Sequence, residues 1–172
     1  MLNFYKHLES FRDLQVKDQL ALVKGTLVQL CVFHAACQPD RRPSKVADFQ
    51  RSYGYGSLKS VLGASALLAD SNLTNEQTAL LRTIIALNSA APNLHSDTRE
   101  ALNEARLIYI KQLMTTVRQN PNPDLNWLCR FQDIFSVVSK TLQLSNYLKK
   151  YVFLNYVSCT SSLPTLIVEL FF

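Results

Sequence analysis

The sequence predicts an all-α domain. The chain has 172 residues, of which 48% are hydrophobic and 18% charged, so it can bury a sizeable core. Apolar residues recur at helical spacing over long segments, and residues that break helices gather mainly at 39–56 and 120–123. Only four glycines occur. Few breakers together with abundant leucine favour helices over an all-β fold.

The first long helix is expected over Val16–Cys37. Before it, Leu2, Tyr5 and Leu8 already lie at helical spacing, and residues 12–15 then interrupt the pattern. Apolar residues cover nearly all sides of the long segment. A helix that is apolar all round is normally enclosed by other elements, so we expect this one to be the buried central helix.

The middle of the chain is expected to contain a loop and two helices. Residues 39–56 are polar and rich in breakers, which predicts a loop with room for a short hairpin. Helices are expected over 58–69 and 76–88. Thr74 and Gln77 have the spacing of a capping box at the start of the second of these helices.

Two longer helices are expected in the second half. The first covers 96–119, with Ser96 at its cap. The Asn-Pro-Asn-Pro run at 120–123 is a linker. Asp124 is then placed to cap a second long helix that runs to about Tyr151.

The C-terminus predicts a short amphipathic helix. Glu169 lies away from an apolar stripe at i, i+3, i+4, i+7 and i+8, formed by Leu163, Leu166, Ile167, Leu170 and Phe171. A helix this short is unstable alone, so it must dock on the body of the domain. Docking that small changes in free energy can reverse would make it a switch, although an ordinary terminal helix has the same pattern.

Charge, cysteines and motifs argue against several classes of protein. The net charge is +5, but the basic residues are scattered and form no stripe with interleaved aromatics, which argues against direct nucleic-acid binding. The cysteines lack metal-ligand spacing, so we expect no zinc site and reduced thiols; they are Cys31, Cys37, Cys129 and Cys159. We expect no stretch long enough to span a membrane, and no catalytic motif stands out.

Two segments resemble those of a known family. The stretch 11–25, FRDLQVKDQLALVKG, closely resembles the signature of nuclear-receptor ligand-binding domains at the turn between helices 3 and 4. It is most similar to the pregnane X, vitamin D and constitutive androstane receptor group. The stretch 166–171, LIVELF, matches the family's activation helix. The resemblance extends over 1–172 in helix order, with 105–110 like helix 9 and 125–151 like helices 10 and 11.

The resemblance implies both a fold and a function. The fold is a three-layer antiparallel helical sandwich, with a small β-turn for which 39–56 offers the residues. The function is that of a nuclear, ligand-dependent transcription regulator, not an enzyme, which takes a small lipophilic ligand of steroid or xenobiotic type. Expected partners are coactivators with a Leu-x-x-Leu-Leu motif and a retinoid X receptor, bound through the last long helices. DNA would be contacted only through an upstream domain that is not in this chain.

The family holds its coactivator helix between a lysine and a glutamate. This works because a free helix has unpaired N–H groups at one end and unpaired C=O groups at the other. Lys6, five residues before Phe11, matches the clamp lysine, and Glu169 matches the clamp glutamate. The other groove residues that the resemblance implies are Gln19 and Lys24 on the rim and Leu2, Leu20 and Leu170 on the apolar floor.

The same alignment implies a ligand pocket lined by Val28, Cys31, Val32, His34, Ala35, Ser145 and Asn146. Two interpretations of His34 stay open. Its ring either hydrogen-bonds a ligand hydroxyl or is a core histidine satisfied by a backbone carbonyl.

Three features depart from the family pattern. The chain has no counterpart of helix 1 and of the first half of helix 3, which supply a wall of the pocket. Gln29 and Ala91 stand where heterodimerising receptors carry a Glu and an Arg. No DNA-binding zinc module is present. Two alternatives therefore stay open: a truncated, ligand-independent interaction module or dominant-negative partner, and an unrelated all-α scaffold.

Overall fold

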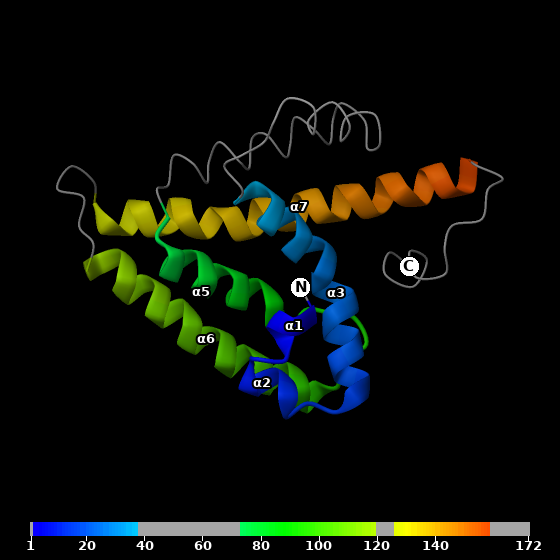
Figure 1. Ribbon diagram of the computed structural model, residues 1–172, viewed down its shortest axis with the longest axis horizontal. Helices are drawn as coiled ribbons and strands as arrows, with labels where there is room; N and C mark the ends of the chain where they lie inside the picture. The colour runs from blue at the N-terminus through cyan, green and yellow to red at the C-terminus, as the bar shows by residue number, and fades with distance from the viewer. Residues whose placement is uncertain (1, 38–72, 120–125, 159–172) are drawn as a thin grey trace.

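A computed structural model of the chain describes residues 2–37, 73–119 and 126–158 (Figure 1). Every element in these ranges is a helix, which confirms the all-α class. The helices are α1 (Leu2–Tyr5), α2 (Glu9–Arg12), α3 (Val16–Ala36), α5 (Asn75–Ala86), α6 (Ser96–Gln119) and α7 (Trp127–Ser158). The predicted loop at 39–56, the helix at 58–69 and the C-terminal helix at 163–171 lie outside the described residues.

Local capping signals set two of the helix starts. At α5 the Gln77 backbone N–H donates to the Thr74 hydroxyl at 3.1 Å, and the Thr74 N–H donates to the Gln77 side-chain carbonyl at 3.2 Å, so the predicted capping box is confirmed. At α7 the side-chain oxygen of Asn126 accepts the Leu128 N–H at 3.0 Å. Asn126 therefore takes the capping place that was predicted for Asp124. The helix also continues past the predicted end at Tyr151.

The central helix of the described fold is α5. It contacts α3, α6 and α7, and Figure 1 shows it between α6 and α3, below the long α7. Leu81, Ile84 and Ile85 are at most 1% exposed. The prediction that Val16–Cys37 is the buried central helix is therefore wrong in one respect. α3 buries one side only, and Val16 and Leu20 are 70% and 57% exposed.

α3 has the length and mean hydropathy of a membrane span, contrary to the expectation that no stretch does. A core helix of a folded domain passes the same test. The buried polar side chains of α3 are hydrogen-bonded within the domain. Thr26 donates to Leu22 O at 2.7 Å, Gln29 donates to Val138 O at 2.9 Å, and Asp18 accepts from residues at the start of α6. These contacts are those of a helix packed against its own domain.

Gln29 and Ala91, which stand where the resemblance led us to expect a charged pair, both lie in the core. Gln29 is 3% exposed and its amide also donates to the Thr141 hydroxyl at 3.2 Å, which ties α3 to α7. Ala91 is 2% exposed and lies directly against Gly25. A Cβ added at Gly25 would come within 2.6 Å of the Ala91 Cβ, so the close approach depends on glycine.

Candidate functional site

The segment that precedes α3 is anchored by Tyr5. Its side chain is 1% exposed, its ring centroid lies 5.1 Å from that of Phe11, and its hydroxyl is hydrogen-bonded to that of Thr26 in α3. Burial raises the pKa of Tyr5 to about 12. Lys6 directly follows this anchor, and its side chain is exposed.

Gln19 fixes the turn between α2 and α3. Its side-chain amide donates to the backbone carbonyls of Phe11 at 3.0 Å and Leu14 at 3.1 Å. The side chain is half-buried, and its amide is directed at the turn. The sequence prediction placed Gln19 on the rim of a groove. The described contacts give it the separate task of holding α2 against the start of α3.

Asp18 joins the same segment to α6. Its side chain is 2% exposed, and it accepts hydrogen bonds from Thr98 at 2.6 Å and from the His95 backbone N–H at 3.1 Å. The Thr98 hydrogen bond, reinforced by those from His95, holds the pKa of this carboxyl below its usual value. The stretch 11–25 thus contains the residues that hold α2, α3 and α6 together.

The exposed side of α3 carries an apolar stripe. Its residues lie at i, i+4, i+7, i+11 and i+15, and we define the α3 stripe as Val16, Leu20, Val23, Leu27 and Cys31. All five are exposed or half-buried, whereas the opposite side of α3 lies in the core. The exposed side chains of Lys17 and Lys24 border the stripe. Among the predicted groove residues, Leu20 and Lys24 therefore lie on one surface.

Val16 is the residue that the sequence analysis missed. It precedes Leu20 by one helical turn and is the most exposed large apolar side chain of those described. The i, i+4 spacing to Leu20 was the available signal. For the other predicted groove residues, Leu2 lies in α1 but its side chain is outside the description, and Glu169 and Leu170 lie outside the described residues.

The predicted pocket residues divide into two groups. Val28, Val32 and Ser145 are buried, and Ala35 is half-buried. Val32 packs with Leu144 and Leu148 of α7 in a small apolar cluster separate from the main core. By contrast, the exposed positions are Cys31, His34 and Asn146. His34 is accordingly no core histidine, and its role toward a ligand stays a prediction.

Within the described ranges, no group of three or more His, Cys, Asp or Glu side chains is placed to hold a metal ion. Cys31, Cys37 and Cys129 are free thiols, and burial raises the pKa of both Cys31 and Cys37.

In comparisons with known proteins, no protein-family model matches the chain, and no curated protein sequence matches it either.

Proposed function

We propose that this chain is a receptor-type effector domain that binds an amphipathic Leu-x-x-Leu-Leu helix on the α3 stripe, under the control of a small lipophilic ligand. The observation that carries the proposal is the exposure of Val16 and Leu20, 70% and 57%, on a helix whose other side is core. Together with Val23, Leu27 and Cys31 they form a continuous apolar stripe, which is the kind of surface that an amphipathic helix can cover.

The energetics favour a helical peptide as the occupant. Burying one Val or Leu side chain stabilises a complex by roughly 1.5–3 kcal/mol before entropy losses. Lysines at the border add direction, because the C-terminal carbonyls of a peptide helix carry partial negative charge. Lys17 and Lys24 border the stripe and offer that charge, and Lys6 is a further exposed lysine in the segment before α3. We propose Lys6 as the residue that meets the C-terminal end of the peptide.

The ligand would sit between α3 and α7. Support comes from the cluster of Val32 with Leu144 and Leu148, and from Ser145, which is 2% exposed beside it. A three-layer sandwich is the arrangement that would enclose such a site. Leu142 and Tyr147 of α7 are 38% and 45% exposed, and we propose this side of α7 as the surface for a retinoid X receptor or a similar partner.

A ligand-independent interaction module is the second candidate. The observation that favours it is the exposure of Cys31, His34 and Asn146, three of the residues that were expected to enclose a ligand. The peptide surface on α3 requires neither His34 nor Asn146, whereas Cys31 forms its C-terminal end. Under this alternative the chain would bind the same peptide with or without a lipophilic compound.

The test is a fluorescence-polarisation titration of a labelled Leu-x-x-Leu-Leu peptide with the full chain. Leu20→Asp should weaken binding about tenfold or more, because it places a charge in an apolar contact. Leu107→Asp is the matched control, since Leu107 is 54% exposed on α6. Lys6→Ala, compared with Lys111→Ala on α6, tests the proposed contact with the end of the peptide.

The results of these titrations distinguish the receptor-type function from the ligand-independent module. Binding that strengthens with a pool of lipophilic compounds and is lost only in Leu20→Asp supports the receptor-type function. Binding that is lost in Leu20→Asp but ignores the compounds favours the ligand-independent module. Equal affinities for Leu20→Asp and Leu107→Asp, or no binding by a chain whose circular dichroism is helical, would contradict both.

A further inference from the structure

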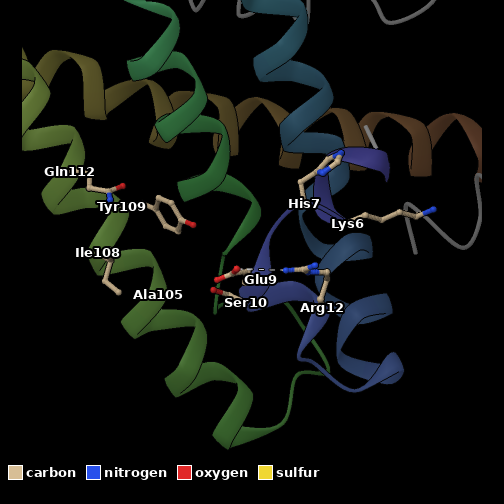
Figure 2. A pocket seen from close by; sticks show the side chains of 9 residues that line it. All are labelled: Lys6, His7, Glu9, Ser10, Arg12, Ala105, Ile108, Tyr109 and Gln112. Carbon is tan, nitrogen blue, oxygen red and sulfur yellow. Dashed lines mark ion pairs between the residues drawn. The ribbon is translucent and has the colours of Figure 1, made fainter.

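A cavity of about 440 Å³ that is open to solvent on one side lies between the α1–α2 segment and α6 (Figure 2). This volume is within the range of sites for small organic molecules. The cavity is distinct from the α3 stripe, because it shares none of the five stripe residues. None of its residues is needed by the proposed peptide site except Lys6 at the rim.

One wall is a stripe of α6. Its residues lie at i, i+3, i+4 and i+7, and they are Ala105, Ile108, Tyr109 and Gln112. Ala105 and Tyr109 pack against the core, which fixes their positions. In Figure 2 the Tyr109 ring projects from α6 toward α2. This wall therefore offers two aliphatic side chains, one aromatic ring and the amide of Gln112.

The opposite wall supplies one carboxylate, that of Glu9, beside Lys6, Arg12 and the imidazole of His7. Glu9 and Ser10 lie on the side of α2 that faces α6, whereas Lys6 points away from α6 (Figure 2). The Glu9 carboxylate is paired with Arg12 at 3.7 Å, and both side chains are exposed. An exposed pair of this kind contributes little to stability, so a ligand can replace Arg12 as the partner of Glu9.

We propose that this cavity binds a small organic ammonium with an apolar body. The cation would lie between the Glu9 carboxylate and the Tyr109 ring, which attracts a cation through its negatively polarised face. The hydroxyls of Ser10 and Tyr109 offer further acceptors for the N–H groups. Ala105 and Ile108 would contact the apolar body. No bond is made or broken, so the site is a binding site only.

The experiment is calorimetric titration of the full chain with three probes of one shape. These are 3-phenylpropylammonium, the neutral 3-phenylpropanol and the anionic 3-phenylpropionate. The ammonium should bind most tightly and the carboxylate most weakly. Glu9→Gln should weaken the ammonium about fivefold, while Arg12→Gln should strengthen it about twofold by removing the competing cation. Tyr109→Leu should reduce the preference for ammonium over alcohol.

Opposite effects of Glu9→Gln and Arg12→Gln cannot come from a general loss of folding, since both side chains are exposed. Leu20→Asp on the α3 stripe should leave ammonium binding unchanged, which separates this site from the peptide site. The proposal is overturned if the ammonium does not bind, if the carboxylate binds as tightly, if Glu9→Gln has no effect, or if Leu20→Asp abolishes binding.

Discussion

The carboxylate of Asp18, in the first turn of α3, accepts the backbone N–H of His95 at 3.1 Å, directly before α6 begins. The His95 ring nitrogen Nδ1 lies 3.0 Å from the same oxygen, and the Thr98 hydroxyl donates to the other at 2.6 Å. One helix thus provides the cap for another. The N-terminal N–H groups of α6 carry partial positive charge, which favours an ionised carboxylate at this place.

The free energy of unfolding should therefore fall in acid. Because the folded-state pKa of Asp18 is lowered, its contribution is complete above the unfolded-state pKa and is lost as the pH falls through the folded-state pKa. Urea unfolding between pH 2 and pH 6 checks this. Asp18→Asn should be less stable at neutral pH, and its stability should depend less on pH in the acid range.

Asp97→Asn is the matched control for the Asp18 prediction. Asp97 lies in the first turn of α6, but its side chain is exposed. It should retain the acid dependence of the unmodified chain. Equal acid dependence in Asp18→Asn and in the unmodified chain would show that Asp18 is not the group responsible.

Gly25→Ala should destabilise the domain although alanine is the better helix former. The added Cβ would lie 2.6 Å from the Ala91 Cβ and 3.2 Å from its Cα, so the backbone must move. Overpacking of this kind costs about 1–3 kcal/mol, against a gain in helix propensity of about 1 kcal/mol. We expect a net loss of up to about 2 kcal/mol in urea unfolding.

The double variant Gly25→Ala with Ala91→Gly tests the cause. Removing the Ala91 Cβ makes room for the new one, so the double variant should recover most of the loss. Ala91→Gly alone serves as the control for the second change. Simple addition of the two single effects would refute the steric explanation.

Helix periodicity and capping predicted most of the described fold. The extents of α3 and α6 and the Thr74–Gln77 box follow from local signals, which act over one turn. The predicted cap of α6 was wrong, because Ser96 is itself the first helical residue and its hydroxyl donates to the Asp97 carboxylate. These local signals did not predict that α5 is the central helix. α3 is more apolar in composition than α5, and the prediction rested on that composition. Whether a helix is enclosed depends instead on which elements pack against both of its sides.

The candidate site was predicted only in part, for a related reason. Leu20 and Lys24 share a surface because they lie at positions i and i+4 of one helix. The hydrogen bonds of Asp18 with His95 and Thr98 connect residues that are 77 or more positions apart in the sequence, and no local pattern indicates them. The exposure of His34 and Asn146 likewise depends on how α3 and α7 cross, which spacing within one helix does not determine.

Thr74→Ala should remove the cap of α5. The hydroxyl accepts the Gln77 N–H at 3.1 Å, and loss of such a cap costs about 1 kcal/mol. Thr74→Ser, which keeps the acceptor, should lose much less. Thr115→Ala is a control in the middle of α6, where the exposed threonine only donates to Lys111 O. A Thr74→Ala variant as stable as Thr115→Ala would contradict the capping role.

Gln29→Ala should lower the free energy of unfolding by about 1–3 kcal/mol. The Gln29 amide is buried and donates to Val138 O at 2.9 Å and to the Thr141 hydroxyl at 3.2 Å, so truncation removes both bonds between α3 and α7 and leaves a void. Gln143→Ala, at an exposed position of α7, should change stability by less than about 0.5 kcal/mol.

A double-mutant cycle separates the hydrogen bond from the void. Thr141→Val removes the hydroxyl that the Gln29 amide contacts and keeps the shape of the side chain. If the contact between the two side chains stabilises the domain, the cost of Gln29→Ala should be smaller in the Thr141→Val background. An unchanged cost would assign the whole effect to packing and to Val138 O. In either case, a Gln29→Ala variant as stable as Gln143→Ala would show that this amide does not hold α3 to α7.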